Sequence, residues 1–472
     1  MNFKSVVEVG LTDHLPQDVQ AMLLAKYSRD YSPIADRLPS EQMDMDKLRA
    51  SLRTYYQGYG HKSVGQLGET TSYLEGVSQI AAKALEDHPL FNGQESSTRY
   101  IDFGGQPMVH FDDPEIKEVQ ELLRGLYITA LNQVNERVCS EYPFVYQGGD
   151  RDKELIRWKN TCRARAYDIC RAILPAGVTT NVGFKATFDV HNDHFGSLLA
   201  HPSPEVSSLA ERVLHAGAER YPDAFKAVDK LREENAYKSP NFFYSDPMVV
   251  KGFQLTQETP LGVRRSIPAQ QLSIAVLKPD LIEEAIARLT KLRKWQSLSP
   301  ELSSAARVRV QGLLDFGSFR DLHRHRNGVN VMPLLMAHYG INEWYMAQLP
   351  KSVVASLNAL MVRINHAFID AIEARDVDRL VKLQYMVPMG ANVPIDYACD
   401  LNQIKYIVEL RSGLTVHQTL RLFCHRVYSR LVTQLNLEEV GEAYRGIYPD
   451  LTQDNFTLKR GEQTFTGELK LE

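Results

Sequence analysis

The densest group of side chains able to do chemistry is a run of four basic residues, His323 to Arg326. Adjacent residues that can carry positive charge repel one another unless they are solvated or face an anion. Apolar residues flank the run on both sides, at 313–322 and 329–335, so it lies at the edge of a core. Arginine binds phosphate through two parallel hydrogen bonds, and histidine can donate to the same oxygens. The pattern fits an anion-binding site and a solvated basic face about equally well.

Two further clusters carry polar groups at short spacing. The stretch from Glu95 to Tyr100 reads E-S-S-T-R-Y, which suits a phosphorylated, hydroxyl-rich ligand and equally suits an ordinary polar turn. The stretch from Gly60 to Ser63 reads G-H-K-S, and we expect a turn followed by a helix there. Ser63 would cap that helix and Gln66 would complete a capping box.

Composition limits the classes of protein that remain. The chain has 472 residues, 54 Lys+Arg against 58 Asp+Glu and a net charge of −4. That length predicts two to four domains, and the charge balance argues against a dedicated binder of polymeric nucleic acid. No apolar run reaches the length of a membrane span and the first residues lack a signal-peptide core, so we expect a cytoplasmic protein without a membrane role. Five cysteines without a C-x-x-C pair favour reduced thiols.

Helices dominate the expected secondary structure. Apolar residues at spacings of three and four predict a long helix within 352–376. A second helix is expected from Asp280 to Trp295, with Asp280 as its cap and Glu283 completing a capping box. Short β-branched or aromatic segments predict strands at 5–10, 108–111, 242–244 and 248–255. The sequence therefore predicts an α+β protein in which strands are the minority.

Two pairs of segments repeat in the same order along the chain. Residues 170–200 and 383–413 each contain an apolar turn that ends in proline, at Pro175 and Pro388. Residues 76–100 share an outline with residues 315–335. Their common order predicts a tandem duplication. We place the boundary in the turn-rich stretch after residue 235, with a first domain of residues 1–235 and a second of residues 236–472.

The segment from Gly60 to Tyr100 resembles the flavin-dependent thymidylate synthase family. Members of that family carry G-H-x-S/T-x-x-E-H, then Q-x-x-R-H-R, then E-x-S-x-R-Y. The central R-H-R triplet is matched in the second repeat, by Arg324 to Arg326. A later family block begins with A-R-x-x-L-P, matched at Arg171, and closes with L-R, matched at Arg411. The resemblance implies two tandem synthase-like domains, helix-rich with a smaller sheet in each, paired about a pseudo-twofold axis.

The two repeats have lost complementary parts of the family pattern. The first has Asp87-His88-Pro89 at the R-H-R position, and the second has residues 332–335 (M-P-L-L) where E-x-S-x-R-Y should stand. The second repeat also has Gln384 as the counterpart of Arg171. The family's active sites are built from several subunits, so each repeat could keep only its own share of a common site. The first repeat keeps His61, Ser63, Glu95, Ser97, Arg99, Tyr100 and Arg171, and the second keeps Arg324, His325, Arg326 and Arg411.

The resemblance implies a reductive methylation of dUMP, in which methylenetetrahydrofolate donates carbon and NADPH reduces FAD. By matching position, Arg324, Arg99 and Arg411 would be catalytic. Substrate would be bound by Glu95, Ser97, Arg99, Tyr100, Arg171, Arg324 and Arg411, and the cofactor by His61, Ser63, Arg324, His325 and Arg326. The partners implied are a small nucleotide and a second copy of the chain, because a homodimer would reproduce the family's tetramer. No metal and no protein nucleophile are needed.

Departures from the family pattern keep two alternatives open. The family's flavin-contacting N-x-R is residues 187–189 (T-F-D) in one repeat and 400–402 (D-L-N) in the other, so neither keeps the arginine. The glutamine ahead of R-H-R is Ala84 in one and Asp321 in the other, and the glutamate of the G-H motif is Gln66. The alternatives are a nucleotide-binding homologue without this catalysis and a structural assembly protein.

Two histidine-containing groups have ordinary explanations. His191, His194 and His201 with nearby aspartates include an H-x-x-H pair, for which surface or pocket histidines are a better interpretation than a metal site. His417, Arg421, His425 and Arg426 recur at a spacing near four, and we expect a solvated basic helix face there.

Overall fold

The computed structural model describes residues 15–28, 44–238, 240–244, 270–331, 333–452, 458–460 and 463–465. The strands predicted at 5–10 and 248–255 lie outside the described residues. The fold divides into two compact units. Unit 1 comprises residues 1–75, 84–95 and 181–243, and unit 2 comprises residues 76–83, 96–180 and 244–472. The predicted domain boundary at residue 235 stays a prediction.

Unit 1 contains helices around a small three-stranded sheet. The sheet has the order β1-β3-β2, and β2 runs antiparallel to β3. Residues 242–244, predicted as a strand, instead form the end of the short helix α10 and the turn after it. This helix begins at Pro240, a position where proline costs no helical hydrogen bond. The elements of unit 1 are α1 (Gln17–Ala25), α2 (Met45–Leu52), α3 (Lys62–Gly65), β1 (Glu69–Ser78), β2 (Asn92–Glu95), β3 (Thr179–Thr187), α7 (Phe188–Leu198), α8 (Pro204–Arg220), α9 (Val228–Asn235) and α10 (Pro240–Phe243).

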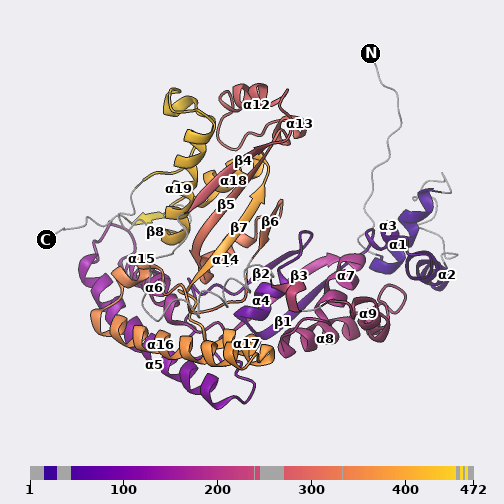
Figure 1. Cartoon of the computed structure of the whole chain (residues 1–472), viewed down its shortest axis with the longest axis horizontal. Coiled ribbons are helices and arrows are strands. Elements are labelled where there is room, and N and C mark those ends of the chain that lie inside the picture. The colour runs from indigo at the N-terminus through magenta and orange to yellow at the C-terminus, as the bar shows by residue number, and fades with distance from the viewer. Residues whose placement is uncertain are drawn as a thin grey trace. The chain divides into compact units, whose positions relative to one another are not determined.

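Unit 2 is built on a four-stranded antiparallel sheet (Figure 1). The strands are β4 (Gln271–Val276), β5 (Ala306–Asp315), β7 (Asn392–Cys399) and β6 (Gly328–Val331), in that order. Burial alternates along β5, where Val308 and Val310 are buried and Arg309 between them is exposed. That alternation is what a sheet with one covered face requires.

Helices of unit 2 supply the rest of its core. The long helices α5 and α16 pack on each other, α5 packs on α6, and α18 packs on α19. They are α4 (Gln79–Leu85), α5 (Pro114–Glu141), α6 (Arg151–Cys170), α12 (Ile282–Leu289), α13 (Pro300–Ser303), α14 (Phe316–His323), α15 (Glu343–Gln348), α16 (Lys351–Glu373), α17 (Val377–Leu383), α18 (Leu401–Arg411) and α19 (Gln418–Gln434). The helix-rich α+β class is confirmed.

The two predicted helices differ in accuracy. The apolar stripe within 352–376 belongs to α16, which ends at Glu373 because Arg375 adopts a left-handed conformation with φ of 53°. The helix predicted from Asp280 to Trp295 is only α12, Ile282–Leu289, and Asp280 is not its cap. Met108, predicted to begin a strand, forms an isolated bridge with Val178.

The same element order occurs twice. The first half of the chain has the order β1, α4, β2, α5, α6, β3, α7, α8. The second half has the order β5, α14, β6, α16, α17, β7, α18, α19, with the short helix α15 inserted after β6. Both sheets also place the third strand of the series between the first and second. The tandem arrangement therefore appears in the topology as well as in the motifs.

Within unit 2 the equivalent turns of the two repeats meet. Pro175 and Pro388 form an antiparallel bridge. Two equivalent hydrogen bonds flank it, from Ala176 N to Val387 O and from Met389 N to Leu174 O, each 2.8 Å long. Because each bond exchanges the roles of the two repeats, a local pseudo-twofold axis relates them at this turn.

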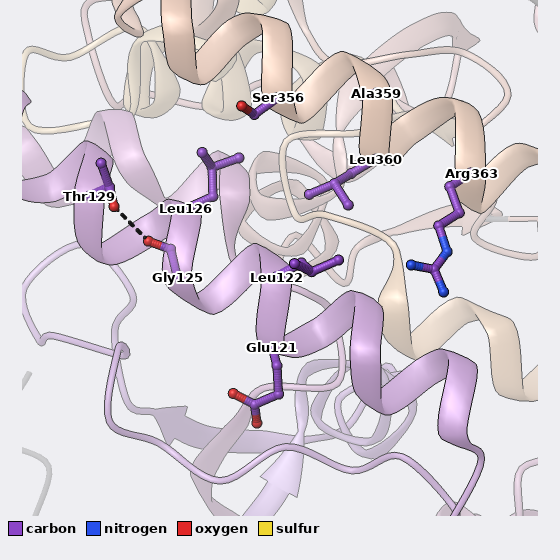
Figure 2. A pocket seen from close by; sticks show the side chains of 9 residues that line it. All are labelled: Glu121, Leu122, Gly125, Leu126, Thr129, Ser356, Ala359, Leu360 and Arg363. Carbon is purple, nitrogen blue, oxygen red and sulfur yellow. Dashed lines mark hydrogen bonds between the residues drawn. The ribbon is translucent and has the colours of Figure 1, made fainter.

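An open groove of about 720 Å³ runs between α5 and α16. Figure 2 shows Leu122 and Leu126 of α5 opposite Leu360 of α16, with the Thr129 hydroxyl donating to the Gly125 carbonyl at 2.9 Å. Among the described residues, α16 is also the one helix long and apolar enough to cross a membrane. One face of it is buried within unit 2, and core helices of soluble proteins have the same length and composition.

Candidate functional site

The site is organised by α14, which follows β5 directly. Asp315 ends the strand and caps the helix, its carboxylate accepting from Ser318 N at 2.9 Å. Ser318, Asp321 and Arg324 are three residues apart, so they share one face of the helix. Arg324 is the C-terminal cap of the helix. Asp321 and Arg324 both keep part of their surface exposed.

Arg171 is the buried anchor of this face. Its side chain is 2% exposed, and its Nε donates to the Tyr345 hydroxyl at 2.9 Å. Its Nη2 donates to Ser318 Oγ at 2.8 Å and to Asp315 Oδ2 at 3.3 Å. Burial alone would lower the pKa of Arg171, but Tyr345 and Asp315 outweigh it and raise that pKa. The guanidinium of the first repeat is therefore held, charged, against the helix of the second.

A buried polar network surrounds this ion pair. His417 caps α19, its Nδ1 lying 2.8 Å from Thr419 Oγ1 and its Nε2 3.0 Å from the Asp168 carbonyl. Thr419 Oγ1 in turn lies 2.7 Å from Ser318 Oγ. Burial, with the charges of Arg171 and Arg99, holds the pKa of His417 well below its usual range. The network keeps an uncharged imidazole beside the arginines.

The expectation of a solvated basic face at residues 417–426 is wrong for two of its members. His417 and Arg421 are buried, and Arg421 donates to the Ser412 and Thr452 carbonyls at 2.8 and 2.7 Å. A spacing near four fits a buried helix face as well as a solvated one, so the pattern alone could not decide.

Arg99 is oriented by a carboxylate that the motif did not include. Its Nε and Nη2 donate to the two oxygens of Asp168 at 2.6 and 3.0 Å, and its Nη1 donates to the Thr415 carbonyl at 3.1 Å. The Arg99 side chain is 16% exposed. Ser97 Oγ accepts from Arg99 N at 3.3 Å, and Tyr100 is exposed next to it. Glu95, the last residue of β2, is buried in unit 1.

Arg411 and His325 form a second fixed pair. Arg411 Nε donates to His325 Nε2 at 2.7 Å, and Arg411 Nη2 donates to the Asp321 carbonyl at 2.9 Å. Burial and the charge of Arg411 lower the pKa of His325 to about 3. His325 is therefore neutral at physiological pH, and because its Nε2 accepts a bond its proton is on Nδ1. Its carbonyl also accepts from the Tyr397 hydroxyl at 3.0 Å.

Asp321 lies within electrostatic range of four arginines. Burial alone would raise the pKa of its carboxyl group, but Arg171, Arg411, Arg99 and Arg324 together lower it. Two of these arginines come from the first repeat and two from the second. Arg326 lies two residues beyond Arg324 and is partly exposed. Four predicted site arginines are thus brought to one place within unit 2.

The residues predicted from the G-H motif belong to unit 1. His61 and Ser63 are exposed, and the His61 ring stacks on Tyr55 with centroids 6.2 Å apart. The predicted cap is wrong, because His61 precedes α3 and Ser63 lies inside it. Lys62 forms an ion pair with Asp193.

The position equivalent to Arg171 is filled by neutral groups. Gln384 Oε1 accepts from Leu335 N at 3.0 Å, and Gln384 Nε2 donates to the Tyr244 hydroxyl at 2.9 Å. Asn402, which stands where the family has its flavin-contacting arginine, accepts from Leu298 N at 2.8 Å and donates to Leu298 O at 2.9 Å. Both side chains are used to hold the local fold.

The H-x-x-H pair consists of buried histidines of unit 1. His191 Nδ1 lies 3.0 Å from the Thr187 carbonyl, and His194 Nε2 lies 2.9 Å from the Leu85 carbonyl. Burial lowers the pKa of His191 to about 4 and that of His194 to about 3. Among the described residues, no group of three or more His, Cys, Asp or Glu is placed to hold a metal ion.

Comparison with known proteins agrees with the motifs. Residues 11–223 match the family described as thymidylate synthase complementing protein, which is the flavin-dependent thymidylate synthase family. The first half of the chain is therefore similar to that family. This similarity implies a function related to thymidylate synthesis.

Relatives resemble the chain over most of its length. A UPF0159 protein of Chlamydia pneumoniae is 24% identical, covering 88% of this chain and 87% of that protein. A UPF0159 protein of Thermoplasma acidophilum is also 24% identical, covering 87% of this chain and 91% of its own. The similarity therefore extends across both halves of this chain, and the names of these relatives state no activity.

Several residues of the site were not found by sequence reasoning. Asp168, Asp315, Ser318 and Tyr345 all contact the arginines, and none lies in a quoted motif. Asp168 comes three residues before Arg171, and Asp315 begins an Asp-x-x-Ser cap sequence. A search for acidic residues within one helical turn of each candidate arginine would have found Asp168.

Proposed function

We propose that this protein carries out a flavin-dependent reductive methylation of a uracil nucleotide, of the dUMP-to-dTMP type, in the cytoplasm. The observation that supports this most is that Arg171 and Arg411 both donate hydrogen bonds to α14, the helix that ends at Arg324. Arg99 lies within electrostatic range of Asp321 on the same helix. Each repeat keeps only part of the family pattern, and the retained arginines of both repeats are neighbours in one unit. Neutral decay of one copy would have no reason to leave such a composite.

The chain's residues suit the binding of an anionic pyrimidine nucleotide. Arg324 and Arg99 are partly exposed residues, so their positive charges can act on a phosphate at the surface. Arg411 is held by His325, and Arg171 is held by Asp315, so these two add fixed positive charge. Fixed cations stabilise negative charge that develops on a uracil ring during attack from C5, without reorganisation at the moment of reaction.

The predicted flavin contacts fit in part. Arg324 and Arg326 are partly exposed cations of the kind that binds a diphosphate. His61 and Ser63 are exposed polar groups of unit 1. His325 is different, because its Nε2 accepts from Arg411 and its Nδ1 lies 3.4 Å from the Gln403 amide. We assign His325 to holding Arg411, and Arg324 and Arg326 to holding the cofactor. Bound flavin would supply the hydride.

The test follows the hydrogen at C5, which methylation must release. Protein with reconstituted FAD should absorb near about 450 nm and should release tritium from dUMP labelled at C5, given methylenetetrahydrofolate and NADPH. Arg324→Gln and Arg99→Gln should abolish release. Arg309→Gln is the matched control, because Arg309 pairs with Asp396 on the exposed side of the sheet. Colourless protein that takes up no FAD and releases no tritium would exclude the proposal.

A nucleotide-binding homologue without this catalysis is the second candidate. It is favoured by Asn402, whose amide is occupied by Leu298 where the family has a flavin-contacting arginine. In that case dUMP should raise the melting temperature, Arg324→Gln should remove the effect, and NADPH should not be consumed.

A dimer of this chain would contain four synthase-like repeats, as the family's assembly implies. The four arginines come from one chain, so this cluster forms within a single copy. Light scattering should give a mass of two chains.

A further inference from the structure

The loop before α13 holds an exposed tryptophan in a strained backbone conformation. Trp295 has a φ of 68°, in the left-handed region that favours glycine, and it is 53% exposed. Its N–H donates to Glu409 Oε2 at 3.0 Å, and Glu409 pairs with Lys405 in a site where both side chains are at most 2% exposed. Strained residues persist only where the surrounding structure holds them, and they are concentrated at functional sites. An exposed indole adds little to a core, so packing does not explain the strain.

Side chains of α18 fix this loop on both sides of Trp295. Before it, the Arg293 carbonyl accepts from Lys405 Nζ at 3.3 Å. After it, the Asn402 amide group holds the N–H and the carbonyl of Leu298, at 2.8 and 2.9 Å. The residue that replaces the family's flavin-contacting arginine therefore positions the loop that carries the tryptophan.

Trp295 and Tyr406 together form an exposed aromatic platform in unit 2. Tyr406 is 47% exposed, and its ring centroid lies 6.1 Å from that of Trp295 with the planes at 62°. The Tyr406 ring also contacts the His325 ring, with centroids 5.8 Å apart. His325 in turn accepts from Arg411 Nε at 2.7 Å. The aromatic platform thus begins one side chain away from the arginine cluster.

We propose that Trp295 and Tyr406 bind the adenine ring of a dinucleotide by stacking. The inference rests on the proposed function, whose two dinucleotides, FAD and NADPH, both carry adenine as part of ADP. Arg324 and Arg326, which we assign to the diphosphate, adjoin His325 in the chain. Half-exposed rings suit adenine, which takes no part in the reaction, better than a flavin ring, which reacts where water is excluded. Aromatic side chains hold bases in this way in many proteins, because every base has a flat face.

The experiment compares ligands with and without the adenine end. Equilibrium dialysis of the full chain measures the affinities for FAD and FMN, and, at saturating FAD, those for NADPH and reduced nicotinamide mononucleotide. Trp295→Gly should weaken the binding of one dinucleotide about tenfold and leave that of its mononucleotide counterpart unchanged. A change in the first pair assigns the aromatic platform to the adenine of FAD, and a change in the second assigns it to the adenine of NADPH.

Glycine is the informative replacement because it also relieves the left-handed strain. Trp295→Gly should therefore not lower the melting temperature. Trp295→Phe and Tyr406→Phe keep an aromatic ring and should keep most of the affinity. Tyr146→Gly is the matched control, because it removes another half-exposed aromatic ring of unit 2 and should change neither pair of affinities.

The outcomes distinguish this inference from the proposed function. Dinucleotide affinities that Trp295→Gly leaves unchanged overturn the inference and leave the function standing. A lower melting temperature with equal losses for dinucleotide and mononucleotide shows a structural role and also overturns it. A loss confined to a dinucleotide, in protein that releases no tritium from dUMP, supports the inference and overturns the function alone. Protein that binds neither FAD nor NADPH overturns both.

Discussion

Replacing Arg171 by glutamine should destabilise unit 2 strongly. The chain itself supplies the matched design, because Gln384 stands at the equivalent position of the other repeat and Ser78 stands at the position equivalent to Asp315. Arg171→Gln removes the positive partner of Asp315, whose side chain is 0% exposed. The double variant Arg171→Gln with Asp315→Ser gives this site the pair that its twin already has.

The size of the expected loss in stability follows from the burial of the Arg171–Asp315 ion pair. Removing one partner of a buried ion pair leaves an uncompensated charge and costs about 3–5 kcal/mol. Arg171 also donates to Ser318 and Tyr345, so those two groups lose a partner as well. The double variant also removes the unpaired Asp315 charge, so about half or more of the lost free energy of unfolding should be recovered. The exposed pair Arg309–Asp396 is the control, and Arg309→Gln should cost about 0–1 kcal/mol.

Urea unfolding followed by circular dichroism measures these free energies, with the two units fitted as separate transitions. A loss below about 1 kcal/mol for Arg171→Gln would refute the reasoning, because the site would then have to admit water to the Asp315 carboxylate. The reasoning would also be refuted if the double variant were less stable than Arg171→Gln alone. Either result would mean that the charge of Arg171 does not stabilise the site.

Two further predictions concern acid and packing. The pKa values of His191, His194 and His325, about 4, 3 and 3, lie below the ordinary value near 6.5, so the unfolded chain takes up protons first as the pH falls. The free energy of unfolding should reach its full value above about pH 6.5 and should be lower at pH 5 by roughly 2 kcal/mol per histidine. Urea titration at the two pH values measures this difference, and equal free energies would contradict the prediction. Gly317→Ala should destabilise the fold by about 1–2 kcal/mol, because the new Cβ would lie 3.1 Å from Arg171 Cζ. Gly125→Ala on α5 places its Cβ where no atom lies within 4 Å, so it should stabilise the fold by up to about 1 kcal/mol. Equal effects of the two alanines in a thermal melt would show that Arg171 is not fixed.

Local patterns predicted local structure well. The apolar stripe of α16 was found because its period of three to four residues is written in consecutive positions. Its end was not found, since the left-handed conformation of Arg375 is uncommon for a residue other than glycine. The capping rule failed at Asp280 and Ser63, where suitable residues exist but the chain begins its helix elsewhere.

The sequence identified the arginines of the site but not the residues that hold them. The motifs identified the arginines, because guanidinium groups are chosen for their chemistry and keep their spacing. The partners of those arginines are set by tertiary contacts. Arg171 meets Ser318, and Arg411 meets His325, across separations that no local pattern encodes. Burial of His417 and Arg421 was missed for the same reason.

The duplication explains why the site is asymmetric. A pair of repeats related by a twofold axis begins with two equivalent sites, and each repeat contributes one set of residues to each. The site that holds Gln384 lacks a fixed positive charge, so the residues that would serve it are not constrained to bind an anion. Residues 87–89 and 332–335 depart from the family pattern at that same site. The other site holds all four arginines, so the anion-binding role that we propose falls on one composite site of the chain.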